Sequence, residues 1–176
     1  MRRRNTFSGH TCPSAEPFHP MSLTQKWLRQ QVQPYPSAHR VYSDIDATLT
    51  RFPTLRPKSD VFSNSRFLSQ YNHPHFLISL VFDDGRSQLL LCVHGLLPIS
   101  FRGASYNIPM AFWVTRDYPR LPPISFVMPT NDMLVKSGKY LDVSGRCNIE
   151  YIQNWERKPE VRSSAIYVVI GSHDVG

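Results

Sequence analysis

The stretch from Phe101 to Thr130 constrains the fold most, because it places two β-prone runs on either side of a proline-rich corner. Side chains alternate in character from Ser105 to Phe112, and a period near two predicts a strand. The corner at Tyr118–Pro123 holds prolines that cannot continue a hydrogen-bonded ladder, so the chain must turn there. Ile124–Val127 is short and β-prone and predicts the next strand. Two strands around a rigid turn can hold aromatic side chains still, as recognition of an extended peptide requires.

Length and charge limit the possible classes of protein. A chain of 176 residues with 41% hydrophobic content forms one domain with an ordinary core. The formal charge is +7, but Arg2, Arg3 and Arg4 concentrate part of it in one short arm. That arm could contact nucleic acid or anionic lipid, although a solvated terminus is the simpler interpretation. No stripe of Lys and Arg with interleaved aromatics follows, so we expect no nucleic-acid partner.

The cysteines and the apolar runs exclude several other classes. Cys12, Cys92 and Cys147 stand alone with no C-x-x-C pair, which argues against a disulfide framework or a zinc site and favours a reducing compartment. His73 and His75 are separated by a rigid proline, and we expect neither a metal nor a cofactor. No apolar run approaches the ~20 residues of a membrane span, and the first residues lack the apolar core of a secretory signal.

The remaining pattern predicts an α+β fold. Ser22–Gln33 opens with a capping box and has apolar residues at helical spacing, and Ala38–Arg51 repeats that spacing. Leu55–Phe62 predicts a strand, and Gln88–Val93 predicts another after an Asp-Gly hairpin signal at Asp84. Two helices therefore precede a set of antiparallel strands.

The domain plan has three parts. Residues 1–20 are expected to be a disordered basic arm, and residues 21–160 to form the domain. Residues 63–80 are polar, then apolar, and look like an insert into a hairpin. Residues 161–176 form an apolar, β-prone tail with no evident place in the fold.

Five short motifs together resemble a known family: FRGASYNIP, YPRLPP, PTNDM, the DDG hairpin, and GRCNI followed by a tryptophan. The chain resembles the ubiquitin-conjugating enzyme variant (UEV) domain of an ESCRT-I subunit, in the tumour-susceptibility/vacuolar protein sorting family. The resemblance covers Met21 to Glu160 apart from Ser63–Leu80. It implies a ubiquitin-conjugating-enzyme-like fold, in which a four-stranded antiparallel meander packs against helices, with the C-terminal helices incomplete.

The resemblance also implies that the chain is not an enzyme. Active ubiquitin-conjugating enzymes need an exposed thiolate and an upstream His-Pro-Asn whose amide stabilises an oxyanion. Aligned on Gly145, the nucleophile position holds Asn148, and Cys147 lies one residue earlier. Gly138–Tyr140 occupies the place of His-Pro-Asn. If this segment is extended, the shift of one residue turns Cys147 to the opposite face, so we expect a buried structural cysteine.

By resemblance, one surface binds Pro-(Thr/Ser)-Ala-Pro peptides. Such ligands are close to polyproline II before binding and complement aromatic faces. Tyr106 and Asn107 match groove residues on a strand, Phe101 replaces a family tyrosine, and Thr130 and Met133 match the loop side of the groove. The alternative for Tyr106 and Met133 is a place in the core.

By the same resemblance, a second surface binds ubiquitin through a hairpin tongue and a concave sheet. The matching positions are Val81, Asp83 and Asp84 on the hairpin, with Trp113 and Phe126 on the sheet. An apolar centre with a polar rim suits a modest interface. The alternative for Trp113 is core packing.

The function implied is a non-catalytic reader of ubiquitin and proline motifs that sorts ubiquitinated cargo into multivesicular bodies. Other ESCRT subunits are expected partners if a longer form of the protein exists. We expect a cytoplasmic protein recruited peripherally to endosomal membranes. The first alternative is an accessory UEV subunit of a conjugating enzyme in ubiquitin chain formation. The second is a nucleic-acid or lipid binder that acts through Arg2, Arg3 and Arg4.

Overall fold

The computed structural model describes residues 21–62, 88–130, 133 and 135–155, with the side chain of Phe101 left out. The predicted basic arm, the insert at 63–80 and the tail at 161–176 lie outside these residues. The elements in chain order are α1 (Leu23–Gln31), α2 (Ala38–Arg51), β1 (Leu55–Phe62), β2 (Gln88–Phe101), β3 (Ala104–Val114), β4 (Ile124–Val127) and α4 (Glu150–Gln153).

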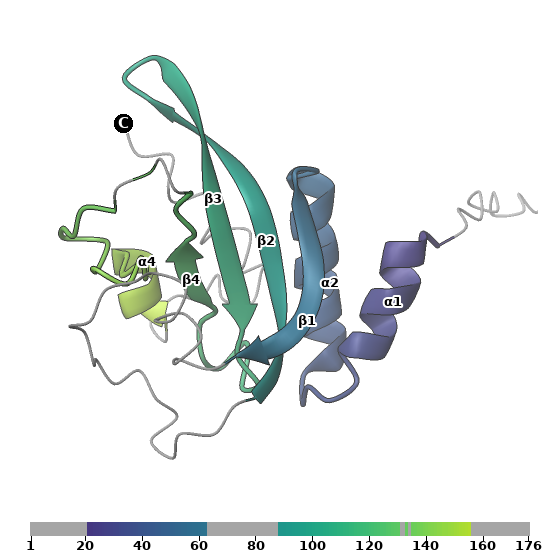
Figure 1. Ribbon diagram of the computed structural model, residues 1–176. Helices are drawn as coiled ribbons and strands as arrows, with labels where there is room; N and C mark the ends of the chain where they lie inside the picture. The colour runs from purple at the N-terminus through teal and green to yellow at the C-terminus, as the bar shows by residue number, and fades with distance from the viewer. Residues whose placement is uncertain (1–20, 63–87, 131–132, 134, 156–176) are drawn as a thin grey trace, which may run out of the picture.

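The two N-terminal helices form where local signals predict them. The Ser22 hydroxyl accepts a hydrogen bond from the Gln25 amide at 3.2 Å, and the Gln25 side chain accepts one from the Ser22 amide at 3.0 Å. This capping box satisfies two amides that a helix start leaves without partners. The helix α2 covers the predicted range and buries Val41 and Ile45. In the view of Figure 1 both helices lie on the β1 side of the sheet, and their buried residues pack against one of its faces.

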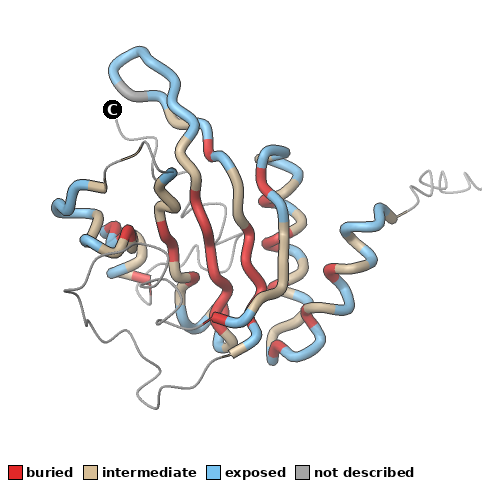
Figure 2. The backbone as a smooth tube through the Cα atoms, viewed as in Figure 1, coloured by how far each residue is buried: buried red, intermediate tan, exposed pale blue. Residues whose placement is uncertain are grey.

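The four strands form one antiparallel sheet in the order β1-β2-β3-β4. This confirms the predicted α+β class and the meander. The strand β2 continues past the predicted end at Val93 to Phe101. All of β3 pairs with it, opposite Leu91 to Phe101. The prediction was too short because Gly95 and Pro98 interrupt strands locally, whereas here a continuous partner strand supplies the pairing. The far end of this hairpin is exposed, and its lower half is buried (Figure 2).

Each face of the sheet carries its own apolar cluster, because side chains alternate across a strand. On the face that we call the helical face, Phe112, Leu91 and Val93 pack with residues of α1 and α2. On the opposite face, which we call the outer face, the buried cluster contains Phe62, Leu90, Cys92, Ala111, Trp113 and Phe126. The helices therefore cover one face of the sheet, and the outer face has a separate, smaller apolar cluster.

A polar network ties the proline corner to the helices. Asp44 of α2 is buried, and its carboxylate accepts hydrogen bonds from the Tyr118 hydroxyl and from Arg40 Nε, the latter at 2.8 Å. On the other side of the corner, the Trp155 indole donates to the Pro119 carbonyl at 2.8 Å. Buried polar groups need such partners, and these bonds hold the corner between α2 and the residues that follow α4.

Candidate functional site

The outer edge of β3 is paired only along part of its length. Within the described residues, β4 pairs with Met110–Trp113, and one further bond joins the Met128 amide to the Pro109 carbonyl at 2.8 Å. From Ala104 to Ile108 no described strand lies against this edge. An exposed edge offers backbone donors and acceptors to an extended ligand.

Two predicted peptide contacts lie on this open edge. Tyr106 keeps 51% of its surface exposed, and Asn107 is also exposed. The alternative that Tyr106 belongs to the core is therefore wrong. Their side chains leave the strand on opposite faces, so a ligand along the edge would meet the aromatic ring on one side and the amide on the other.

The other three predicted peptide contacts lie on neighbouring segments. Thr130 is exposed after β4, and the half-buried Met133 donates its amide to the Thr130 carbonyl at 2.9 Å. Extending the β3–β4 register would set Thr130 level with Asn107. Phe101 ends β2 opposite Ala104, and only its backbone is described.

The predicted ubiquitin contacts are only partly described. Val81, Asp83 and Asp84 lie outside the described residues. Trp113 and Phe126 share the outer face but are buried, with 4% and 6% of their surfaces exposed. Trp113 packs against Phe62 with ring centroids 5.1 Å apart. Core packing thus accounts for most of the surface of Trp113.

A pocket of about 230 Å³ opens on the outer face above Trp113. Lys58 Nζ lies 5.6 Å from the centroid of the Trp113 ring, and His94 and Met128 complete much of the wall. Burial, and secondly the Lys58 ammonium, hold the pKa of His94 below its usual range, so the imidazole is neutral at pH 7. Lys58, His94 and Met128 were not predicted from the sequence as site residues. The only signal for Lys58 was the polar alternation of Arg56, Lys58 and Asp60 along the strand.

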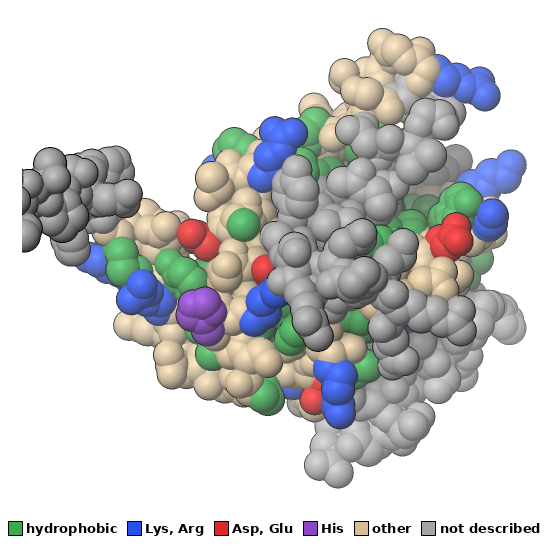
Figure 3. Space-filling view, turned by 180° about the vertical axis from the view of Figure 1, so that it is seen from behind, with side chains coloured by type: hydrophobic (Ala, Val, Ile, Leu, Met, Phe, Trp, Pro, Cys, Tyr) green, Lys and Arg blue, Asp and Glu red, His purple; other side chains and the backbone are tan. Residues whose placement is uncertain are grey.

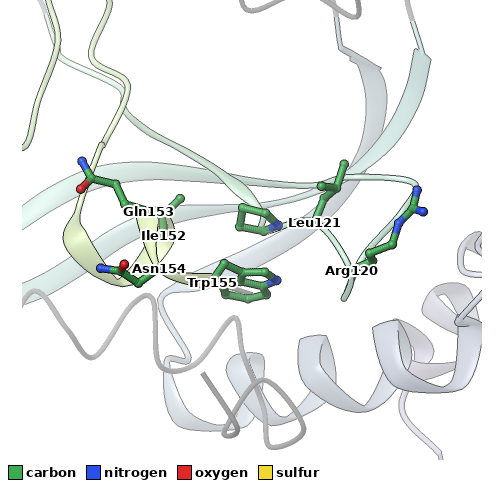
Figure 4. A pocket seen from close by; sticks show the side chains of 7 residues that line it. Arg120, Leu121, Ile152, Gln153, Asn154 and Trp155 are labelled. Carbon is green, nitrogen blue, oxygen red and sulfur yellow. The ribbon is translucent and has the colours of Figure 1, made fainter. Parts of the chain in front are cut away.

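A second cavity, of about 370 Å³, lies between the proline corner and α4. Figure 4 shows Arg120 and Leu121 on one side of it and Ile152, Gln153 and Asn154 on the other, with Trp155 below. The Trp155 ring is held by its hydrogen bond to the Pro119 carbonyl and by an edge-to-face contact with Tyr151, whose ring centroid lies 5.9 Å away. None of these residues was predicted to bind a ligand.

The two parts of the predicted former catalytic centre, around Tyr140 and around Asn148, lie side by side. The Asn148 amide donates to the Tyr140 carbonyl at 2.8 Å, and Cys147 forms an isolated β-bridge with Leu141. Cys147 is 5% exposed and packs in the cluster of the helical face, whereas Asn148 is exposed. The prediction of a buried Cys147 is confirmed. Burial raises the pKa of its thiol to about 11, so the nucleophilic thiolate is scarce at neutral pH.

The described residues offer little for other ligand classes. No three His, Cys, Asp or Glu side chains gather there into a possible metal site. On the face seen in Figure 3, the Lys and Arg side chains of the described part are scattered rather than gathered in one stripe. No helix in the ranges described is long and apolar enough to cross a membrane.

Two solved structures define the class of fold. One, a complex of the Vps23 UEV with ubiquitin, has a TM-score of 0.59 and 24% identity and covers 84% of this chain and 88% of its own. The other, the yeast Vps23 UEV domain with a Vps27 PSDP peptide, has a TM-score of 0.62 and 22% identity and covers 96% of this chain and 97% of its own. The fold is therefore of the ubiquitin-conjugating-enzyme type.

The family follows from the sequence match. The UEV domain model matches residues 65–172, and the chain belongs to the UEV domain family. UEV domains are non-catalytic variants of the conjugating-enzyme fold. The human Tumor susceptibility gene 101 protein is 29% identical over 85% of this chain, and the match covers 34% of that protein. The chain thus spans about a third of the length of this relative.

Proposed function

We propose that this chain is a non-catalytic module that binds ubiquitin and Pro-(Thr/Ser)-Ala-Pro peptides for ESCRT-I-dependent sorting into multivesicular bodies. The observation that carries the proposal is the open edge of β3, where Tyr106 and Asn107 are exposed. Two relatives of the same fold are known as complexes, one with ubiquitin and one with a PSDP peptide. Both ligand classes therefore suit this fold.

The peptide would lie along the open edge. A polyproline II ligand makes no hydrogen bonds of its own, so its backbone can bond to the strand edge, and little chain entropy is lost on binding. The ring of Tyr106 offers a flat apolar face to a proline, and the amide of Asn107 can fix the direction of the ligand. Thr130 and Met133 would close the groove from the loop side, with Phe101 at the hairpin end.

Tyr106→Ala should weaken the binding of a Pro-Thr-Ala-Pro peptide by at least about ten-fold, because exposed aromatic anchors carry a large share of such interfaces. Fluorescence anisotropy with a labelled peptide measures the affinity. Tyr140→Ala is the matched control, since Tyr140 is similarly exposed, at 49%, but lies outside the proposed groove. If the peptide binds Tyr106→Ala as tightly as the wild-type chain, Tyr106 does not line a peptide groove and the proposal is contradicted.

Ubiquitin would bind through the outer face and the hairpin that precedes β2. Trp113 and Phe126 would form the floor of this contact. Val81 would add an apolar contact from the hairpin, and Asp83 and Asp84 would form its polar rim. A floor with so little exposed surface gives a modest interface, and single modules of this kind gain strength when several ligands are held on one membrane.

Catalysis is absent from the proposed function because the nucleophile position holds Asn148, which has no thiol. Cys147, the neighbouring thiol, faces the core. Gly138–Tyr140, in place of His-Pro-Asn, supplies no side-chain amide for an oxyanion.

Incubation with ubiquitin, activating enzyme and ATP should therefore give no thioester on this chain. Non-reducing gel electrophoresis detects any ubiquitin thioester, with an active conjugating enzyme as the positive control. A ubiquitin adduct that dithiothreitol removes, and that Cys147→Ser abolishes, would contradict the proposal.

In the cell, the proposed module comprises residues 21–160 and acts on endosomal membranes, to which it is recruited peripherally. Its proposed partners include ubiquitinated cargo and other ESCRT subunits.

A further inference from the structure

The pocket on the outer face adjoins the proposed peptide edge. Leu96 of β2 and Pro109 of β3 face each other in the strand register, and both line the pocket. Met128, which also lines it, bonds to the Pro109 carbonyl at 2.8 Å. Asn107 lies two residues before Pro109 and on the same face of the strand. A peptide held at Asn107 therefore reaches the pocket within one or two residues.

The charge of the pocket is one-sided. Among the lining residues in the described part of the chain, Lys58 carries the charge, His94 is neutral, and no carboxylate is present. The Trp113 ring lies 5.6 Å from Lys58 Nζ and attracts it, which keeps the ammonium at the pocket. Asp60 approaches Lys58 at 3.4 Å, but the two side chains are 42% and 41% exposed, so solvent screens this pair. The ammonium has three donors and can take a second carboxylate.

The size of the pocket favours one side chain over a small molecule. Its volume of about 230 Å³ lies below the ~300–1,000 Å³ of typical small-molecule sites. Ala111 and Trp113 form an apolar floor that suits methylene groups, and Lys58 stands where a charged end would lie. A glutamate or aspartate side chain has this combination of an apolar stem and an anionic head.

We propose that this pocket binds the side chain of an acidic residue adjacent to the proline motif of the peptide ligand, with Lys58 as its charge partner. The inference rests on the proposed function, because it assigns a preference to the same peptide-binding edge. It adds a determinant of specificity outside the Pro-(Thr/Ser)-Ala-Pro core.

The test compares two labelled peptides with the same Pro-Thr-Ala-Pro core, one flanked on both sides by glutamate and the other by glutamine. The glutamate peptide should bind at least about three-fold tighter, as expected for a partly exposed charge pair. Lys58→Gln should abolish this preference, and Lys58→Arg should retain it. Lys26→Gln, which removes an exposed charge on α1, should leave it unchanged. Raising the salt concentration should reduce the preference.

The outcomes separate this inference from the proposed function. If both peptides bind equally, or if the preference survives in Lys58→Gln, the inference is overturned. In either case, weaker binding of both peptides to Tyr106→Ala would still support the peptide-binding function. If neither peptide binds the wild-type chain, the proposed function and the inference both fall.

Discussion

Gly95→Ala is expected to destabilise the fold by about 3–5 kcal/mol, through backbone strain together with a steric clash. Gly95 lies in β2 with φ at +148°, a conformation that residues with a Cβ rarely adopt. A Cβ built there would lie 2.4 Å from the carbonyl oxygen of Thr54 and 3.1 Å from the Cα of Leu55. Both atoms belong to the backbone where β1 begins, so relief requires the two strands to move apart.

Gly103→Ala is the matched control for this substitution. Gly103 also has a positive φ, +79°, but a Cβ there would meet nothing within 4 Å. Gly103→Ala should therefore lower the free energy of unfolding by only about 1–2 kcal/mol, from conformational strain alone. Urea denaturation followed by circular dichroism measures both variants. Equal midpoints for the two would show that the strands tolerate the Cβ at Gly95.

Tyr35→Phe should cost about 2–4 kcal/mol, although it removes a single oxygen atom, because two buried backbone groups would lose their partner. The Leu91 amide donates to the Tyr35 hydroxyl at 2.8 Å, and that hydroxyl donates to the Val114 carbonyl at 3.0 Å. Leu91 and Val114 face each other where the β2–β3 pairing ends. The hydroxyl therefore closes the ladder between the two strands.

The control for this loss is Tyr106→Phe, in which the removed hydroxyl belongs to an exposed side chain. Its effect should stay within about 0.5 kcal/mol. The same denaturation experiment compares the two variants. If Tyr35→Phe were as stable as the control, the Leu91 amide and the Val114 carbonyl would have to form hydrogen bonds without the hydroxyl, which would contradict this prediction.

Local signals predicted the helices and the sheet class well. The capping box at Ser22 begins α1, and α2 follows the apolar spacing that predicted it. The extent of β2 escaped prediction because Gly95 and Pro98 act as breakers in isolation. Both residues fit in β2 because β1 packs closely against Gly95 and β3 pairs with this part of the strand. A local sequence pattern does not show such partner strands.

The candidate site was predictable where the alternation of a strand decides it. Cys147 is buried and the next residue, Asn148, is exposed, as the expected change of face implies. The pocket was not predictable, because Lys58, His94 and Met128 come from three strand regions that only the register brings together. The burial of Trp113 likewise depends on Phe62, which is distant in the sequence.

The proposed function requires this chain to bind both a proline-motif peptide and ubiquitin. Chemical-shift mapping tests this, with isotope-labelled protein titrated separately with a Pro-Thr-Ala-Pro peptide and with ubiquitin. We expect saturable shifts at Tyr106, Asn107 and Thr130 for the peptide, and at Trp113 and its outer-face neighbours for ubiquitin. The absence of shifts with either ligand at millimolar concentration would contradict it.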